Sequence, residues 1–307
     1  MRVCVIGGTG HTGKNLTTML VEAGHEVTVV SSGRTPVPDG GVWPSVRHVQ
    51  LVYGSEKWTD TIRDLQPEVI VDILQAASPE LYEALRDICE HFVLCGSLWM
   101  LGRPRVVPTP AETQGPCLSE GYVRRYEQLL ATKARAAAEG KALTAIMCPN
   151  ICGPYKIPLE GKGGRSIDVH RAHQRGEPVI LPEPGNCLIG PCDAKDIARG
   201  FFCAVENREA AADQIFNVGS AYALTALQFI ETYGDIYGVT IPIEFVSWER
   251  FATEVLPDWG ANYHFGANMC PDISPISEKL GYRPAYTPEQ AMERAVKWMI
   301  DEKLLVG

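Results

Sequence analysis

A glycine-rich turn near the N-terminus constrains the fold of this chain more than any other sequence feature. The residues Gly7-Gly-Thr-Gly10-His-Thr-Gly13 directly follow a continuous apolar run at 3–6. Such a run is typical of a strand that is buried on both faces of a parallel sheet. After the turn, apolar residues recur at helical spacing from Leu16 to Ala23, and Gly24 ends this segment. The sequence therefore predicts a strand, a sharp turn and a helix in that order.

The glycines of this turn predict a site for a diphosphate. Glycine lets the chain turn sharply, and it lets a diphosphate approach the backbone because no Cβ stands in the way. The free N–H groups and the positive dipole end of the following helix attract phosphates. The third glycine allows the helix to pack closely on the sheet. We therefore predict a dinucleotide site, and the alternative is a glycine-rich turn without a ligand. The predicted site residues are Gly7, Thr9, Gly10, His11, Thr12 and Gly13.

The residues after the strand predicted at 27–30 indicate which dinucleotide binds. Sites that prefer NAD usually carry Asp or Glu at this position, where the carboxylate holds the ribose 2′-hydroxyl. This chain has Ser31, Ser32 and Arg34 there instead. Arginine and hydroxyl groups can hydrogen-bond a 2′-phosphate. The sequence thus favours NADP over NAD, and the alternative for Arg34 is a solvated loop charge.

Strand and helix patterns alternate along most of the chain, which indicates a parallel sheet covered by helices on both faces. The predicted fold class is α/β, a doubly wound parallel sheet (Rossmann) with a smaller, mainly helical C-terminal substrate domain. We expect residues 1–152 plus about 183–222 in the dinucleotide-binding domain, and about 153–182 plus 223–307 in the substrate domain. Further strands are predicted at 48–52, 69–74, 92–94, 143–148 and 214–218, and helices at 59–65, 79–91, 121–139, 166–175 and 196–207.

Composition excludes several classes of protein. Apolar residues make up 45% of the 307 residues and charged residues 21%, which is typical of a globular chain rather than a disordered one. The net charge of −9 opposes nucleic-acid binding. No apolar stretch approaches the ~20 residues that a transmembrane helix needs, and the N-terminus has no secretion signal. We therefore expect no membrane association and a cytoplasmic protein.

The cysteines and histidines point to neither a disulfide framework nor a metal centre. None of the ten cysteines forms a Cys-x-x-Cys pair, and several lie in apolar runs. This pattern favours buried thiols of a reduced cytosolic protein. His170 and His173 can share one face of a helix, but no carboxylate or cysteine stands at a matching distance. We expect no metal site.

Several motifs occur in an order that resembles the extended short-chain dehydrogenase/reductase family, the NAD-dependent epimerase/dehydratase group. The turn at 7–13 is similar to the Gly-x-x-Gly-x-x-Gly form of that family. Other similar segments are Pro149-Asn-Ile-Cys-Gly-Pro154, Asp193-Ala-Lys-Asp-Ile-Ala198, Phe216-Asn-Val-Gly219 and Lys279-Leu-Gly-Tyr-Arg-Pro284. The resemblance implies that Leu74, Gln75, Ala76 and Pro149 also line the cofactor site. It further implies a homodimer.

The resemblance implies a catalytic set of Ser97, Tyr122 and the residue four positions after the tyrosine. In the family that residue is a lysine, whose charge favours the phenolate, but here it is Tyr126. A free tyrosine has a pKa of ~10 and is a poor base at neutral pH. Three explanations stay open. Tyr122 acts with weaker activation, or a cation such as Lys156 or Arg165 reaches the site, or the chain uses chemistry without a redox step.

Residues after the strand predicted at 143–148 indicate the substrate. We assign Trp99, Asn150, Lys156, Arg165 and His170 to the substrate site. The basic residues favour an anionic, sugar-like small molecule such as a sugar phosphate, a nucleotide sugar or a carboxylate. Trp99 and an aromatic cluster at 259–265 can stack on a sugar ring or base, or can be part of the core.

The motifs and the composition of the chain are compatible with two different classes of function. The first is an NAD(P)-dependent epimerase, dehydratase or reductase that moves a hydride to or from a carbinol of a sugar. The second is a binding module without catalysis, since the family resemblance extends to RNA-binding and regulatory members. Loss of the lysine fits the second function, whereas the net negative charge opposes RNA.

Overall fold

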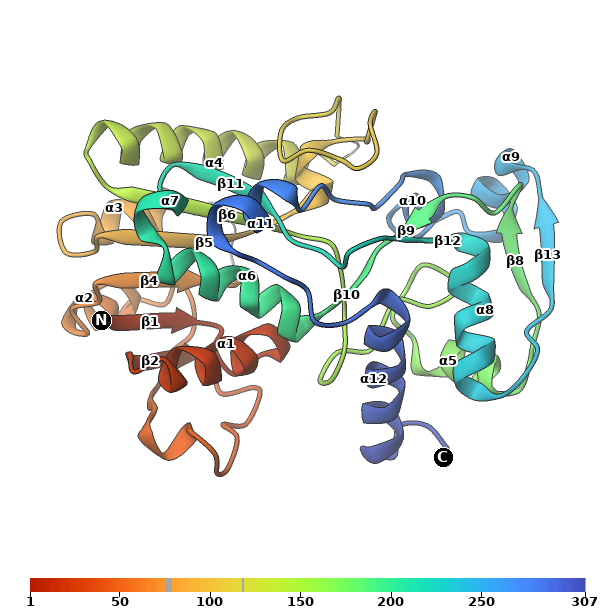
Figure 1. The fold of residues 1–307 in the computed structure, drawn as a ribbon, viewed down its shortest axis with the longest axis horizontal. Helices are drawn as coiled ribbons and strands as arrows, with labels where there is room; N and C mark the ends of the chain where they lie inside the picture. Colours follow the sequence, from red (N-terminus) through yellow and green to blue (C-terminus); the bar gives the residue numbers. More distant parts are fainter. Residues whose placement is uncertain (75–78, 118, 307) are drawn as a thin grey trace.

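The computed structural model describes residues 1–74, 79–117 and 119–306. Its larger part is built on one parallel sheet with the strand order β11-β6-β5-β4-β1-β2-β3 (Figure 1). This order confirms the predicted doubly wound sheet. The strands are β1 (Arg2–Ile6), β2 (Glu26–Ser31), β3 (Arg47–Gln50), β4 (Val69–Asp72), β5 (His91–Ser97), β6 (Ala142–Cys148) and β11 (Gln214–Asn217).

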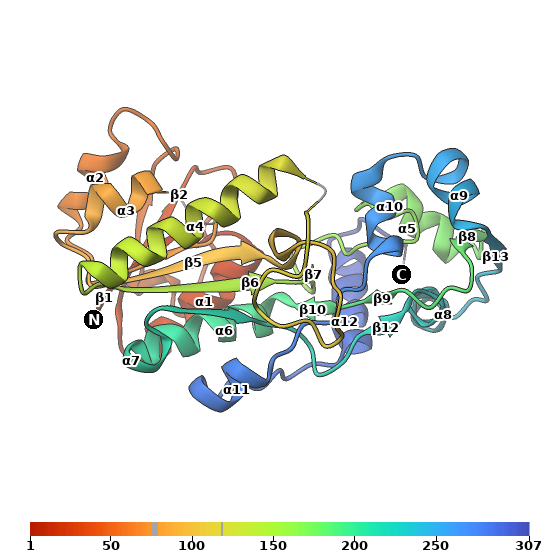
Figure 2. The same ribbon diagram turned by 90° about the horizontal axis from the view of Figure 1, so that it is seen from above.

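Helices cover both faces of this sheet because β1 alternates its apolar side chains between them. Val3 and Val5 share one core cluster with α1 (His11–Glu22) and α6 (Ala194–Glu206). Cys4 and Ile6 share the other cluster with the second layer of helices. That layer, seen on the opposite side of the sheet in Figure 2, contains α2 (Trp58–Asp64), α3 (Pro79–Leu85) and α4 (Glu120–Ala138). A strand buried on both faces explains the unbroken apolar run in the sequence.

The smaller part of the fold has a core cluster of its own, which draws on residues 152–189 and 224–305. This separate core supports the two predicted domains, whose bounds we keep as a proposal. Its helices are α5 (Ile167–Gln174), α8 (Ala226–Tyr237), α9 (Trp248–Arg250), α10 (Trp259–Gly266) and α12 (Pro288–Asp301), and it also contains a π-helical turn, η3 (Phe251–Val255). The short helix α7 (Arg208–Ala211) belongs to the larger part, where it precedes β11.

Short strands in and beside the smaller part were not anticipated from the sequence. They form three two-stranded pairs, β10 with β7, β12 with β9, and β13 with β8. Runs of two to four residues carry too little periodicity to identify a strand. Their bounds are β7 (Asn150–Cys152), β8 (Val179–Pro182), β9 (Leu188–Ile189), β10 (Pro191–Asp193), β12 (Leu224–Thr225) and β13 (Ile243–Val246). By contrast, α11 (Ser274–Leu280) packs against the larger part, since Ile276 and Leu280 belong to its core.

The ends of several predicted elements differ from the structure for local reasons. The strand predicted at 69–74 ends at Asp72, whose carboxylate accepts the Leu74 N–H at 2.9 Å and turns the chain. The helix predicted at 79–91 ends at Leu85. β5 extends to Ser97, which pairs with Cys148 of β6. Two 3₁₀ turns, η1 (Trp43–Ser45) and η2 (Leu98–Leu101), were not predicted.

A loop after η2 ties the two parts of the fold together. Thr109 receives a hydrogen bond from Asp272 N at 2.8 Å and donates one to Cys270 O at 2.7 Å. The Asn217 side chain also donates to Thr109 O at 2.8 Å. These bonds fasten the chain before α4 to the chain after α10. The N-terminus of α4 therefore has a fixed position near the smaller part.

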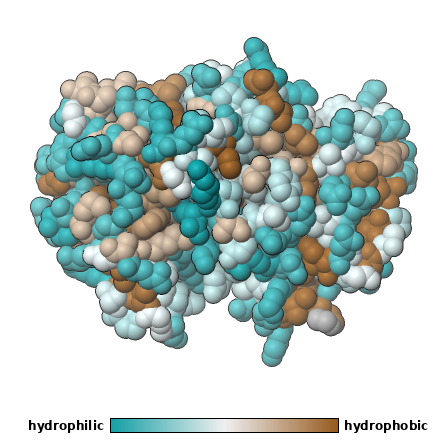
Figure 3. All heavy atoms as spheres, viewed as in Figure 1, coloured by the Kyte–Doolittle hydropathy of each residue, from teal (hydrophilic) through white to brown (hydrophobic). Residues whose placement is uncertain are grey.

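The molecular surface mixes hydrophilic and hydrophobic side chains. Figure 3 shows teal residues interspersed with small brown groups over the face seen in Figure 1. Within residues 1–74, 79–117 and 119–306, no helix combines the length and apolar character that crossing a bilayer requires.

Candidate active site

The glycine-rich turn has the geometry that a diphosphate cradle needs. Gly7 has a φ of +83°, and its N–H donates to Val30 O at 2.8 Å. A Cβ on Gly8 would meet the Val29 side chain, and a Cβ on Gly13 would lie 2.5 Å from the Gly8 Cα. Gly8 and Gly13 are therefore required for packing of α1 against the sheet. The first N–H groups of α1 point out of the carboxyl edge of β1 and have no helical partners.

Gly10, the N-cap of α1, is required neither by conformation nor by packing. Its φ of −74° and ψ of 174° are open to any residue. Among the described residues, chain neighbours left out, a Cβ there would meet one atom within 4 Å, Gly7 O at 3.3 Å. A side chain would thus fit the protein but would fill the space in front of the helix N-terminus. A ligand that approaches the backbone explains a glycine at this position.

A cavity of about 360 Å³ continues from this turn along the ends of β1 and β2. Ser31 is buried there, and its hydroxyl lies 2.8 Å from His48 Nε2. Arg34 is exposed at the rim, and the described residues provide no hydrogen-bond or ion-pair partner for it. Predicted cofactor residues that line this cavity are Gly7, Thr9, Gly10, Ser31, Ser32, Arg34 and Leu74.

The floor of the cavity contains aromatic residues that sequence reasoning did not assign. The rings of Tyr53 and Trp58 lie 4.4 Å apart between centroids, and both line the cavity. Val52 and Leu74 are exposed apolar side chains on the same cavity. An adenine base can be held between such groups. The sequence contained a signal for this site, because Tyr53 directly follows the strand predicted at 48–52.

The remaining predicted cofactor residues fall into three places. Thr12 is buried in the first turn of α1, and its Oγ1 has no hydrogen-bond partner among the residues that the structure describes. His11 begins α1, and Pro149 is buried between β6 and β7. Gln75 and Ala76 lie outside the described residues.

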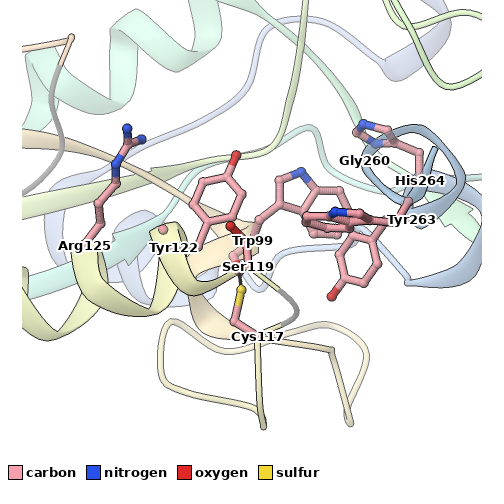
Figure 4. A pocket seen from close by; sticks show the side chains of 10 residues that line it. Trp99, Cys117, Ser119, Tyr122, Arg125, Gly260, Tyr263 and His264 are labelled. Carbon is pink, nitrogen blue, oxygen red and sulfur yellow. Dashed lines mark hydrogen bonds between the residues drawn. The ribbon is translucent and has the colours of Figure 1, made fainter.

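A second cavity, of about 440 Å³, lies between the start of α4 and α10. Tyr122 from α4 faces it, with Trp99 of η2 between Tyr122 and His264 of α10 (Figure 4). None of the described residues lining it is acidic. The lining residues are Trp99, Cys117, Ser119, Gly121, Tyr122, Arg125, Trp259, Gly260, Tyr263 and His264.

Ser97 and Tyr126 do not line this cavity in the described structure. Ser97 ends β5, and its Oγ accepts the Trp99 N–H at 3.3 Å. Tyr126 packs against the core beneath α4. Its pKa is raised, first by burial and then by the Glu112 carboxylate, and the Thr113 backbone hydrogen-bonds to it. The structure therefore brings Tyr122 together with Trp99 and His264 rather than with Ser97 or Tyr126.

Asn150 joins the second cavity through a histidine. It is buried in β7, and its Nδ2 lies 3.1 Å from His264 Nδ1. The ring of His264 in turn lies 5.3 Å from that of Trp99, centroid to centroid. Two of the predicted substrate residues, Trp99 and Asn150, thus meet at one place. The sequence identified His264 only as part of an aromatic cluster.

Lys156 and Arg165 gather around the start of α1. Burial, together with the smaller effect of the charges of Lys156 and Arg165, lowers the pKa of His11 to about 4. Arg165 donates to Ile151 O at 3.0 Å and to Ile157 O at 2.6 Å. No ion pair with a carboxylate is formed by Lys156 or Arg165 within the described residues. These two cations therefore remain available to an anionic ligand near the helix N-terminus.

His170 does not face the ligand cavities, and its assignment to the substrate site is corrected here. Its side chain is fully buried, with Nδ1 3.0 Å from Tyr237 Oη and Nε2 3.2 Å from Pro158 O. Burial lowers its pKa to about 4. An apolar core can hold a neutral histidine when both ring nitrogens have partners. The helical spacing in the sequence could not distinguish this buried face from an exposed one.

The buried His170 predicts a loss of stability in acid. An unfolded histidine has a pKa of 6.5, whereas the folded value is about 4, so the unfolded chain binds the proton first. The unfolding free energy should therefore fall between about pH 6.5 and pH 4, by up to ~1.4 kcal/mol per pH unit for this group. In denaturant titrations at pH 7 and pH 5, His170→Gln should show a smaller pH dependence than the wild type. Equal slopes in the variant and the wild type would contradict the assignment.

The sequence of the chain matches a known protein family. Residues 3–219 match the family described as NAD dependent epimerase/dehydratase. The chain belongs to the NAD-dependent epimerase/dehydratase family. The match spans the glycine-rich turn, the Tyr122 helix and the segment around Asn150.

Two curated relatives of this family member differ in their descriptions. The UDP-glucose 4-epimerase of Corynebacterium glutamicum is 24% identical over 275 residues, covering 80% of this chain and 83% of that protein. The chloroplast stem-loop binding protein of 41 kDa b of Arabidopsis thaliana is 25% identical over 239 residues. That match covers 73% of this chain and 60% of that protein.

Solved structures share the fold of this family member over nearly its whole length. The UDP-glucose 4-epimerase of Thermotoga maritima, solved with UDP-glucose, has a TM-score of 0.75 and 18% identity, covering 99% of this chain and all of that chain. The UDP-glucuronic acid 4-epimerase of Bacillus cereus, solved with NAD, has a TM-score of 0.74 and 14% identity, covering 98% and 99%. Identities this low show the shared fold alone.

Proposed function

We propose that this protein is an NAD(P)-dependent enzyme that acts on a carbinol of a nucleotide sugar. The observation that carries the proposal is the glycine at position 10, which the fold does not need but which a bound diphosphate does need. The cavity that contains Tyr122 supports it, because that cavity lies at the same carboxyl edge of the sheet. Ligands of open α/β sheets bind at this edge.

We assign the binding and proton-transfer roles of this reaction to the following residues. The N–H groups at the start of α1 bind the diphosphate, and the cavity with Tyr53 and Trp58 holds the adenosine. A bound nicotinamide supplies the hydride acceptor or donor. Tyr122 takes the proton of the substrate hydroxyl or returns it. Lys156 and Arg165 provide positive charge near the start of α1 in the absence of the family lysine.

A nucleotide sugar fits the second cavity by its chemistry. The described lining offers hydrogen-bond donors from Trp99, Tyr122, Arg125 and His264, and it offers no carboxylate. Sugar hydroxyl and phosphate oxygens accept such hydrogen bonds. The UDP-glucose and UDP-glucuronic acid named for the structural neighbours belong to this class. We propose epimerisation as the net reaction because the neighbours named above are epimerases.

The proposal is tested by incubating the purified protein with NAD or NADP and with UDP-glucose. We expect a second sugar epimer by chromatography, and a new epimer establishes the reaction. A dehydrated product, or an oxidised sugar formed together with NADH or NADPH, would keep the enzyme but change the net outcome. If no dinucleotide and no nucleotide sugar binds, while a structured RNA binds with strong salt dependence, the RNA-binding alternative replaces this proposal.

Arg34 sets an expectation for the choice between NAD and NADP. The guanidinium stands free at the rim of the dinucleotide cavity, next to Ser32 and close to where β2 ends. We expect Arg34→Glu to weaken NADP binding by about tenfold or more, since a charge-assisted hydrogen bond is lost and a repulsive charge is introduced. The NAD affinity should stay within about threefold, because NAD carries no 2′-phosphate there. Fluorescence titrations with both reduced dinucleotides measure this, and an equal loss for both would show that Arg34 does not contact the 2′-phosphate.

A further inference from the structure

A histidine from the smaller part of the fold faces the same cavity as Tyr122. His264 lies in α10 and lines the second cavity (Figure 4). Asn150 Nδ2 lies 3.1 Å from His264 Nδ1. An amide nitrogen can only donate, so His264 Nδ1 accepts and carries no proton. The ring proton of a neutral His264 is therefore on Nε2.

The surroundings of His264 keep its ring neutral. Burial lowers the pKa of His264 to about 4, and the Arg165 charge adds to this effect. The ring also meets Trp99 of η2, with the centroids 5.3 Å apart. Asn150 of β7 is uncharged. The Cys187 thiol hydrogen-bonds to the backbone carbonyl of His264 rather than to its ring. None of these described neighbours can stabilise an imidazolium, so His264 presents an N–H that does not ionise near neutral pH.

This N–H has no partner within the described protein. No hydrogen bond from His264 Nε2 to residues 1–74, 79–117 or 119–306 is found, whereas Nδ1 is bound. Ser97, which the family resemblance places in the catalytic set, ends β5, and its Oγ caps η2 by accepting the Trp99 N–H. The cavity thus contains Tyr122 and His264 but not Ser97. His264 is half-buried on the wall of this cavity, so a ligand or water in the cavity can accept its N–H.

We propose that His264, through Nε2–H, donates a hydrogen bond to a sugar oxygen of the substrate, across the cavity from Tyr122. Asn150 is the positioning residue that fixes which ring nitrogen carries the proton. No proton leaves His264 in this role, and Tyr122 remains the acid and base. The inference rests on the proposed function because it assumes a sugar in this cavity.

Histidine-selective ¹⁵N NMR tests the tautomer separately from activity. The protein labelled in its histidine rings is recorded from pH 5.5 to pH 8, and His264→Gln assigns the resonance. We expect a neutral His264 ring with the proton on Nε2 throughout this range. Addition of UDP-glucose to the protein with NAD should shift the Nε2 resonance. A proton on Nδ1, an imidazolium at pH 7, or an unmoved Nε2 while other resonances shift would overturn the inference.

Kinetic variants complete the test. With UDP-glucose as the probe, His264→Leu should lower kcat/KM by about tenfold, and His264→Gln should recover part of the loss through its amide N–H. Asn150→Leu should also lower kcat/KM, by less than His264→Leu, because the amide N–H that keeps the ring proton on Nε2 is lost and the ring populates both tautomers. His25→Gln is the control and should match the wild type. Equal kcat/KM in wild type and His264→Leu would overturn the inference. If UDP-glucose shifts no resonance and is not turned over, the proposed function itself fails for nucleotide sugars, and the role of His264 falls with it.

Discussion

Replacing Tyr122 with phenylalanine should lower the turnover number for a nucleotide sugar by at least ~100-fold. Tyr122 faces the second cavity from the first turn of α4, where its hydroxyl can reach a bound sugar. Removing the hydroxyl removes the group that exchanges the proton of the carbinol. The dinucleotide affinity should stay within about twofold, because Tyr122 does not line the cavity of the glycine-rich turn. Steady-state kinetics and a dinucleotide titration on the same protein measure both quantities.

Tyr126→Phe provides a matched control for this experiment. It removes the same hydroxyl from the same helix, one turn further on, where the side chain packs under α4 outside the cavity. Its turnover should stay within about threefold of the wild type, apart from a small loss of stability from the bond with the Thr113 backbone. Equal losses in Tyr122→Phe and Tyr126→Phe would contradict a catalytic role for Tyr122. An unchanged rate in Tyr122→Phe would remove it from the mechanism.

Replacing Gly10 with valine should weaken dinucleotide binding at least ~100-fold, which corresponds to ~2.7 kcal/mol. The backbone of Gly10 has angles that valine adopts easily, and within residues 1–74, 79–117 and 119–306 the one close atom that a Cβ would meet is Gly7 O at 3.3 Å. The valine side chain would instead occupy the space that the phosphates need in front of α1. We therefore expect a folded protein that has lost its ligand. Calorimetric titration measures the loss of dinucleotide binding, and thermal unfolding of the same preparation shows whether the variant is folded.

Gly13→Ala is the informative contrast to Gly10→Val. A Cβ at Gly13 would lie 2.5 Å from the Gly8 Cα and 2.7 Å from the Gly8 carbonyl carbon, and neither backbone atom can move aside easily. Gly13→Ala should lower the melting temperature as well as the dinucleotide affinity. Gly10→Val should keep the wild-type melting temperature in the absence of ligand. If Gly10→Val bound dinucleotide normally, the turn would be a packing motif and nothing more.

Features that depend on local sequence were predictable. The run at 3–6, the glycine spacing and the α1 pattern determined the first βαβ unit, because each signal involves neighbouring residues. The sheet followed from repetition of that pattern. The position of Tyr122 at the start of a helix was predicted through the resemblance to the family. The short strands of the smaller part were not, since a pair such as β12 with β9 comprises too few residues to show a period.

The composition of the second cavity could not be predicted, because it is assembled from segments far apart in sequence. Asn150 and His264 are separated by 114 positions and meet only after the smaller part has folded. Ser97 matched a family position, yet its hydroxyl caps η2 beside Trp99. His170 shared the helical spacing of a surface residue but lies in the core. A single sequence gives no information on such long-range contacts.

The chain has Tyr126 at the position, four residues after Tyr122, where the family resemblance implies a lysine. Tyr126 supplies no positive charge, and its own pKa is raised by burial. Lys156 and Arg165, which the sequence suggested as substitutes, lie close enough to His11 to depress its pKa. Their positive charge therefore acts at the start of α1, beside the proposed diphosphate site. We propose that this charge contributes to binding of the diphosphate.

The central claim is that the N-terminus of α1 binds a nicotinamide dinucleotide. Calorimetric titration of the wild-type protein with NAD and with NADP, beside Gly10→Val, tests it most directly. We predict saturable binding of at least one dinucleotide to one site per chain, with a Kd well below ~1 mM, and its loss in Gly10→Val. No heat of binding from either dinucleotide at millimolar concentration, or equal binding by the variant, would contradict the claim.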